Sequence, residues 1–248
     1  MRTWRAEIVR RLPHPGRGFT QGLIAADGTV WESTGLYGSS ALCRYRLGAD
    51  QLDLRAAVPG ELFAEGICRA GQVIWQLTWQ ERVALRWDAD TLEPAGQVPY
   101  NRQGWGMTAA EEYVVTSDGS SELVRRDPGS LQPQSVILVR QAGRRVPGLN
   151  DLAWSAWYGK RIWANVAGTH YLAGIDPDSG EVTDAVNARS ARERHLGDPQ
   201  AIMNGIAALP EPGEFLLTGK GWRSIYHVRL REARDRAAAG ALLAGLAR

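Results

Sequence analysis

The sequence predicts an all-β fold, a five-bladed β-propeller, from three observations. A short pattern recurs five times, β-type runs separated by turn sequences follow each copy, and helical periodicity is almost absent. Repeats of this length are typical of solenoids and propellers, and a unit of about 45 residues with several short strands has the size of one blade. We therefore expect a single propeller domain over residues 1–230.

The repeated pattern is a polar or aromatic residue, then usually Gly, then an aliphatic residue. Its copies begin 44, 40, 45 and 54 residues apart: Gln21-Gly22-Leu23, Glu65-Gly66-Ile67, Trp105-Gly106-Met107, Asn150-Asp151-Leu152 and Asn204-Gly205-Ile206. Equivalent positions of successive blades lie on one ring around the propeller axis, so we expect the first residues of the copies to converge. Among those five first residues, Glu65 alone ionises near neutral pH.

Each copy is followed, 8 to 13 residues later, by a predicted strand that opens on an aromatic residue. These strands begin at Trp31, Trp75, Tyr113, Trp163 and Phe215. A second set of residues follows four or five positions past most of these aromatics: Trp79, Asp118, Ala167 and Lys220. Strand direction alternates within a blade, so it is a hypothesis that the two sets share one mouth.

Turn sequences and the chain ends complete the predicted domain. Residues 127–130 and 176–180 are strong turns, because Pro presets φ, Asp bonds to the backbone and Gly accepts positive φ. The last repeat runs short of strands after residue 230, so we predict that the N-terminal strand at residues 6–11 completes the last blade. Residues 231–248 are rich in Ala, Leu and Arg, which predicts a short C-terminal helix or a frayed tail.

Composition narrows the functional classes. With 44% hydrophobic residues, 23% charged residues and a net charge of +2, the chain is typical of a soluble globular protein, and we predict no nucleic-acid or membrane partner and a monomer. Cys43 and Cys68 predict buried free thiols, and the four histidines form no metal-ligand pattern. The sequence has no signal-peptide core, which predicts a cytoplasmic protein unless a leader was trimmed.

A carboxylate with a lysine and amides nearby can move protons at a carbonyl. These groups supply a proton carrier, a cation and hydrogen-bond donors for a developing oxyanion. On spacing alone, polar residues in a propeller channel can equally well bind water and neighbouring backbone. Trp75, Trp87 and Trp163 are expected in the packing between strands, whereas Trp79 and Trp105 are candidates for a pocket wall.

Ten segments resemble the plant-type glutaminyl cyclases and their bacterial relatives, in the same order along the chain. They are FTQGL (19–23), WESTGLYG (31–38), FAEG (63–66), QLTW (76–79), GWG (104–106), SDGS (117–120), LNDL (149–152), WANV (163–166), NGIA (204–207) and TGKGW (218–222). The resemblance implies a five-bladed propeller that converts the N-terminal glutamine of peptides to pyroglutamate with release of ammonia. It also implies that no metal or other cofactor is required.

The same resemblance implies roles for individual residues. Glu65 would be the general base and then the general acid, while Asn150 and Lys220 would hold the substrate amide and the tetrahedral intermediate. Substrate binding would fall to Gln21, Phe19, Phe63, Trp79 and Trp105. A single carboxylate suits this reaction, because the attacking amine must lose a proton and the departing nitrogen must gain one.

The chain departs from that family at a few positions. Ala167 follows WANV where the family usually has a pocket Trp, so we expect one wall of the pocket to be missing. Asp151 and Gln103 stand where Glu is usual; both keep polarity, and we expect them to be tolerated. His170 occupies a place usually taken by Asp.

Two other functional classes stay open. One is a metal-dependent propeller hydrolase of lactonase type, in which Gln21, Glu65, Asn150 and Asn204 would bind Ca²⁺, although one carboxylate is few for tight binding. The other is a non-catalytic scaffold whose channel groups bind water or an ion and whose rim binds a partner.

Overall fold

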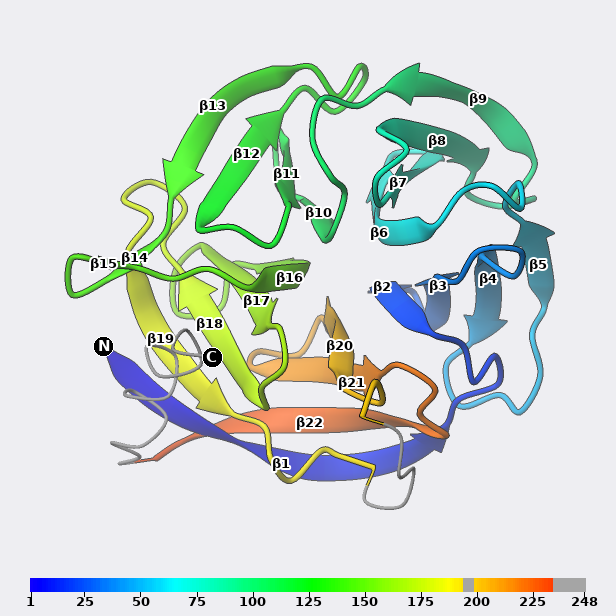
Figure 1. Cartoon of the computed structure of the whole chain (residues 1–248). Helices are drawn as coiled ribbons and strands as arrows, with labels where there is room; N and C mark the ends of the chain where they lie inside the picture. Colours follow the sequence, from blue (N-terminus) through cyan, green and yellow to red (C-terminus); the bar gives the residue numbers. More distant parts are fainter. Residues whose placement is uncertain (194–198, 234–248) are drawn as a thin grey trace.

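The computed structural model describes residues 1–193 and 199–233, and the regular structure of these residues is β-strand throughout. The strands form short sheets arranged in a ring (Figure 1). The all-β, propeller-like prediction is thereby confirmed. No helix that could cross a membrane occurs in the described part of the chain.

Within residues 1–193 and 199–233 the strands form three four-stranded sheets, a two-stranded hairpin and one eight-stranded sheet, whose two halves of four strands count here as the fourth and fifth units. The first three are separate sheets: β2 (Thr20–Ala26), β3 (Thr29–Thr34), β4 (Ala41–Arg46) and β5 (Leu54–Ala57); β6 (Ala64–Ala70), β7 (Val73–Thr78), β8 (Val83–Asp88) and β9 (Pro94–Pro99); β10 (Met107–Ala109), β11 (Val114–Ser117), β12 (Glu122–Arg126) and β13 (Pro133–Leu138). A two-stranded hairpin, β14 (Arg140–Gln141) and β15 (Arg144–Arg145), follows the third unit. The last two units are β16 (Leu149–Ser155), β17 (Arg161–Val166), β18 (Tyr171–Ile175) and β19 (Val182–Asn187), then β20 (Met203–Ala208), β21 (Glu214–Gly219), β22 (Ser224–Glu232) and β1 (Arg2–Pro13).

The N-terminal strand completes the last unit, as predicted. β1 pairs antiparallel with β22, with Leu12 opposite Ile225, so the two strands lie side by side at the bottom of Figure 1. β1 also pairs in parallel with β19, which merges the fourth and fifth units into one eight-stranded sheet. β22 continues to Glu232, two residues past the predicted end of the domain. The helix or tail predicted beyond it lies outside the described residues from 234 on.

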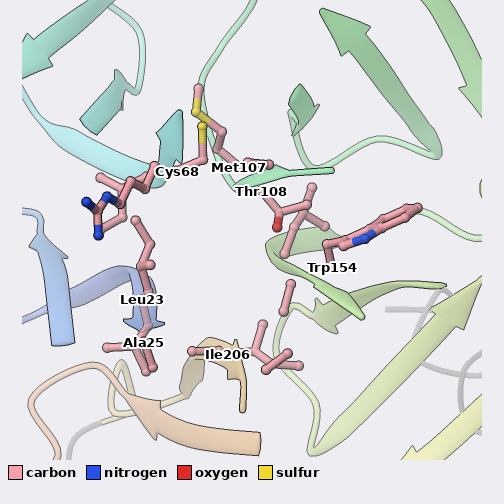
Figure 2. Close-up of a pocket in the computed structure, with 15 residues that line it drawn as sticks. Leu23, Ala25, Cys68, Met107, Thr108, Trp154 and Ile206 are labelled. Carbon is pink, nitrogen blue, oxygen red and sulfur yellow. The ribbon is translucent and has the colours of Figure 1, made fainter. Parts of the chain in front are cut away.

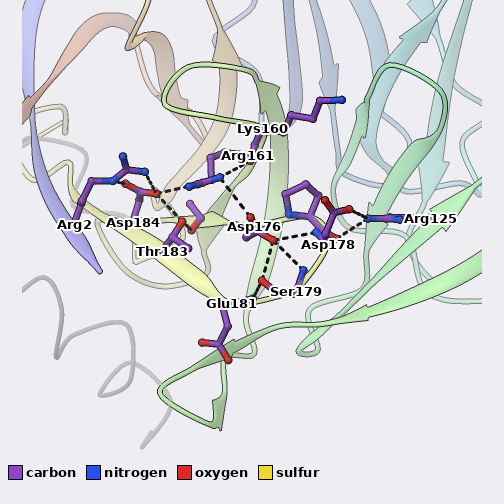
Figure 3. Close-up of polar contacts among 12 residues, drawn as sticks. Arg2, Arg125, Lys160, Arg161, Asp176, Asp178, Ser179, Glu181, Thr183 and Asp184 are labelled. Carbon is purple, nitrogen blue, oxygen red and sulfur yellow. Dashed lines mark hydrogen bonds and ion pairs between the residues drawn. The ribbon is translucent and has the colours of Figure 1, made fainter.

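A buried carboxylate stabilises the parallel pairing of β1 with β19. Asp184 is 1% exposed and accepts hydrogen bonds from Arg2 Nε at 2.7 Å and Arg161 Nε at 3.1 Å (Figure 3). It also accepts one from Trp4 Nε1 at 2.9 Å. Burial opposes ionisation, but the hydrogen bonds from these donors and from Thr183 outweigh it and lower the Asp184 pKa. The N-terminal strand is thus tied to the fourth unit by charge as well as by backbone pairing.

Tryptophans near the start of the second strands pack between neighbouring units. Trp31 and Trp75 are buried, and their indole nitrogens donate to Ala89 O and Pro128 O of the next unit, both at 2.9 Å. Trp87 and Trp163 are also buried, so the packing role predicted for Trp75, Trp87 and Trp163 is confirmed. Cys43 and Cys68 are buried free thiols, as predicted.

The innermost strands touch one another backbone to backbone. A Cβ added at Gly66 would lie 2.5 Å from Trp105 O, and one at Gly106 would lie 2.0 Å from Asn150 O. No side chain fits at these positions, which explains why Gly recurs as the second residue of the repeat. The fourth copy has Asp151 there instead.

Candidate active site

Four of the five innermost strands are bulged where the repeat places its polar residue. The register shifts lie between Thr20 and Gly22, Ala64 and Ile67, Leu149 and Leu152, and Met203 and Ile206. A bulge re-aims side chains and is frequent next to active sites. The residues re-aimed here are Gln21, Glu65, Asn150 and Asn204, each the second residue of its strand.

A cavity of about 490 Å³ lies at the end of the ring where these inner strands begin. Its lining residues are Phe19, Gln21, Leu36, Phe63, Glu65, Trp79, Trp105, Asn150, Pro199, Gln200, Ile202 and Lys220. All eight residues predicted for the site are among them. The structure therefore brings these residues together, while the role of each stays a prediction.

Sequence reasoning missed four residues of the lining: Leu36, Pro199, Gln200 and Ile202. Leu36 is 42% exposed and has a φ of 94°, so it sits in a strained turn directly after β3. Its place within WESTGLYG was an available signal. Residues 199–202 precede β20 and carry no motif, so nothing in the sequence pointed to them.

A chain of amide hydrogen bonds leads to Glu65. Asn204 Nδ2 donates to Gln21 Oε1 at 2.8 Å, and Gln21 Nε2 donates to Glu65 Oε1 at 3.0 Å. Because Asn204 occupies the Gln21 carbonyl oxygen, the Gln21 amide must present its NH₂ group to Glu65. Asn204 itself is fully buried and contributes no lining, so it orients Gln21 from beneath the cavity.

Burial dominates the electrostatics of the cavity. It raises the Glu65 pKa well above its usual range; the positive charge of Lys220 opposes this rise, and the negative charges of Asp151 and Glu81 add to it. Burial also lowers the Lys220 pKa, and the negative charge of Glu65 opposes this fall. A carboxyl with a raised pKa is suited to both accepting and returning a proton near neutral pH.

Asp151 is a second buried carboxylate that the sequence analysis undervalued as a tolerated departure. Its side chain is 0% exposed, and its Oδ2 accepts a hydrogen bond from Ile206 N at 2.9 Å. Burial raises its pKa well above the usual range, against the effect of backbone hydrogen bonds. Glu65 is thus not the sole ionisable group that the repeat brings to the centre of the ring.

Aromatic rings form one wall of the cavity. Phe63 lies edge-on to Phe19 and to Trp79, with ring centroids 6.4 and 5.7 Å apart. Lys220 Nζ lies 4.7 Å from the centroid of Phe19. Within the described residues, the buried Trp105 Nε1 and Asn150 Oδ1 have no hydrogen-bond partner, which is uncommon for buried polar atoms.

The other end of the ring is mainly apolar. Later residues of the same inner strands enclose a cavity of about 220 Å³, among them Leu23, Met107 and Ile206 (Figure 2). Cys68 also lines it, and burial raises the pKa of its thiol. The predicted polar site residues therefore gather at one end of the ring.

Comparison with known proteins decides the family. A sequence model described as glutamine cyclotransferase matches residues 1–230. The chain belongs to the glutamine cyclotransferase family. The glutaminyl-peptide cyclotransferase of Arabidopsis thaliana is 29% identical over 234 residues, which cover 92% of this chain and 72% of that protein.

One solved structure agrees with this assignment to the cyclotransferase family. The crystal structure of Myxococcus xanthus glutaminyl cyclase matches with a TM-score of 0.86 at 30% identity, covering 94% of this chain and 99% of that one. Hydrazine synthase of Kuenenia stuttgartiensis matches with a TM-score of 0.51 at 12% identity, over 87% of this chain and 63% of that one. This second likeness extends to the fold alone.

Of the second set of residues, which follows the aromatic residues that open the predicted strands, two of the four line the cyclotransferase cavity. Trp79 and Lys220 line it together with the repeat residues, as hypothesised. Asp118 instead accepts a hydrogen bond from Arg102 Nη1 at 2.9 Å, and Ala167, whose backbone N donates to Gly148 O at 2.8 Å, does not contribute to the lining. The shared mouth therefore applies to two of the four residues.

No group of three or more His, Cys, Asp or Glu side chains is placed to hold a metal ion within residues 1–193 and 199–233. Metal independence remains a prediction from the family resemblance.

Proposed function

We propose that this member of the cyclotransferase family converts the N-terminal glutamine of a peptide to pyroglutamate and releases ammonia. The observation that supports this best is Glu65: a buried carboxyl with a raised pKa, held by Gln21, in one cavity with Lys220 and Asn150. The cavity also has an aromatic wall suited to an ammonium group, an attraction of about 0.5–2 kcal/mol.

Glu65 first accepts a proton from the substrate. The α-amine of the peptide has a pKa of about 8 and is mostly protonated at pH 7, so it must lose a proton before it can attack. Its nitrogen then attacks the γ-amide carbon, which forms the C–N bond of the five-membered ring and places negative charge on the carbonyl oxygen. Because this attack is intramolecular, the cavity contributes by holding a reactive conformer.

Lys220 and Asn150 support the tetrahedral intermediate, and Glu65 completes the reaction. The ammonium of Lys220 and the amide of Asn150 interact with the developing oxyanion and with the substrate amide. Protonated Glu65 then gives its proton to the departing nitrogen, the bond to that nitrogen breaks and the carbonyl re-forms. Glu65 is then a carboxylate again, and the released ammonia takes the extra proton from the ring nitrogen and leaves as ammonium.

A coupled ammonia assay on a dipeptide amide that begins with glutamine tests this proposal. Glu65→Gln keeps the shape of the side chain and removes proton transfer, and we expect kcat to fall by about 10²–10⁴-fold. Glu93→Gln, the same change at an exposed side chain, is the control and should leave kcat unchanged. Full activity in Glu65→Gln would contradict the mechanism, and no ammonia release by the unaltered protein would contradict the function.

A further inference from the structure

His14 and Glu32 form an ion pair that solvent does not reach. His14 follows the end of β1 and Glu32 lies in β3, and both side chains are 0% exposed. His14 Nε2 lies 2.8 Å from each carboxylate oxygen of Glu32. The hydroxyl groups of Thr20 and Tyr45 donate to the same carboxylate at 2.7 and 2.9 Å. The pair therefore joins the first unit of the ring to the strand that closes the last.

Both ring nitrogens of His14 face hydrogen-bond acceptors. Nε2 faces the Glu32 carboxylate, and Nδ1 lies 2.8 Å from the backbone oxygen of Trp222. A carbonyl oxygen cannot donate, so Nδ1 carries a proton, and one further proton lies between Nε2 and the Glu32 carboxylate. Because Thr20 and Tyr45 also donate to that carboxylate, the contacts favour the imidazolium form of His14.

The charges around the pair agree with this protonation state. Burial opposes the charge on His14, but Glu32, the Trp222 carbonyl and the more distant Glu193 outweigh it and raise the His14 pKa. Burial likewise opposes the charge on Glu32, and the partners of its carboxylate lower its pKa. Cys43, opposite Glu32 in the sheet, has a thiol pKa raised to about 12 and stays neutral.

The Trp222 carbonyl belongs to the turn that carries Lys220. Residues 220–223 connect β21 to β22, and Trp222 N donates to Gly219 O at 3.1 Å, which closes a turn over residues 219–222. The turn touches the segment after His14 at three further points: Gly221 N donates to Gly18 O at 2.8 Å, Thr20 Oγ1 lies 3.3 Å from Gly219 O, and Lys220 forms an isolated β-bridge with Phe19. His14 N also donates to Arg223 O at 3.2 Å. In this set of contacts, the one from His14 to Trp222 O is made by a charged side chain.

We propose that the His14–Glu32 pair positions Lys220 for the cyclisation reaction, with His14 holding the 219–222 turn against the first unit of the ring. This inference rests on the function proposed above, because it concerns the lysine assigned there to the tetrahedral intermediate. His14 does not line the cavity, so it is a positioning residue and touches no substrate.

The turn that carries Lys220 keeps backbone hydrogen bonds when His14 is replaced, from Lys220 N to Ile202 O at 3.0 Å and from Gly221 N to Gly18 O at 2.8 Å, so His14 adjusts the position of Lys220 and does not fix it alone. Phe19 O accepts a hydrogen bond from Gly35 N at 2.9 Å, and Gln21 is held by Asn204, so both keep these supports when His14 is replaced. Substrate binding should therefore survive the loss of His14, whereas the interaction of Lys220 with the intermediate should weaken. The expected effect is on kcat, with KM nearly unchanged.

Replacing His14 with glutamine in the full chain tests this kinetic expectation. His14→Gln should lower kcat for a Gln-initiated dipeptide amide by about tenfold and change KM by less than about twofold. The matched control is His227→Gln, which removes another His–Glu contact, to Glu214, at the opposite end of β21 from Lys220. The control should keep kcat within about twofold of the unaltered protein. A folded His14→Gln variant with unchanged kcat would overturn the inference.

A second readout needs no substrate. The chain has two lysines, Lys220 and Lys160, and Lys160 pairs with Glu111 on the surface, so ¹³C labelling of lysine gives one reporter signal and one internal reference. His14→Gln should shift the Lys220 signal and leave that of Lys160 in place; an unmoved Lys220 signal would overturn the inference. If the unaltered protein releases no ammonia, the proposed function fails while this signal still reports the positioning.

The protonation state can be checked without any substitution, which keeps the inference testable if His14→Gln does not fold. ¹⁵N NMR of labelled histidine should show one buried, slowly exchanging imidazole with protons on both nitrogens at pH 7.5. A ring without a proton on Nδ1 would overturn the inference, because His14 could then not donate to the Trp222 carbonyl.

Discussion

Replacing Gly106 with alanine tests whether the site depends on backbone contact between inner strands. A Cβ at Gly106 would lie 2.0 Å from Asn150 O, whereas ordinary contact begins at 3.4 Å, so β10 or β16 must move by about 1.4 Å. Overpacking of this kind costs about 1–3 kcal/mol of unfolding free energy, and displacement of a catalytic group by about 1 Å can cost about 10²-fold in rate. We expect Gly106→Ala to show both effects, because Asn150 lines the cavity.

Urea unfolding and the coupled ammonia assay measure the two effects of Gly106→Ala. Gly129→Ala is the matched control: Gly129 is exposed, and the nearest atom to its added Cβ is Asp127 Oδ1 at 3.5 Å. The control should change the unfolding free energy by no more than about 0.5 kcal/mol and leave kcat unchanged. A Gly106→Ala variant with the stability and kcat of the unaltered protein would refute the close approach of the two strands.

Three further outcomes follow from the site. Because the Asp151 pKa is raised on folding, the folded chain holds a proton that the unfolded chain loses, so stability should fall by up to about 1.4 kcal/mol per pH unit above about pH 4. Asp151→Asn should reduce this slope in urea unfolding between pH 5 and 8, and an unchanged slope would contradict the burial of its charge. Trp79→Ala should raise KM about tenfold and alter kcat little, since an aromatic wall binds substrate and transition state alike; a loss confined to kcat would count against that role. Dialysis against a chelator should leave ammonia release unchanged, and a loss restored by Ca²⁺ would favour a metal-dependent mechanism.

The repeat made much of the site predictable. Equivalent positions of a ring converge whatever fills the space between them, so Gln21, Glu65, Trp105 and Asn150 could be expected at one level from spacing alone. The location of Lys220 and Trp79 was harder to predict, because strand direction alternates within a blade and the spacing does not show at which end of the blade a residue lies. The resemblance to a known family supplied their roles.

Pairings between distant segments were not predictable. His14 lies 208 residues from the Trp222 carbonyl that it binds, and no local pattern marks either residue as a partner. Asp151 was visible but undervalued, since its buried environment is created by β2 and β20, which contribute the backbone of Leu23 and Ile206. The lining at residues 199–202 lacks a motif because apolar contact can be supplied by many side chains.

Closure of the ring by β1 and β22 also sets when the enzyme can become active during synthesis. Some 210 residues separate the end of β1 from the start of β22, which corresponds to about 10–40 s of translation at 5–20 residues per second. Throughout that interval β1 has no β22 to pair with, and Lys220 and the Trp222 carbonyl are made only at its end. A nascent chain can therefore hold Glu65 in a folded unit without a complete cavity, and we expect catalytic competence to arise in one late step, when β1 pairs with β22.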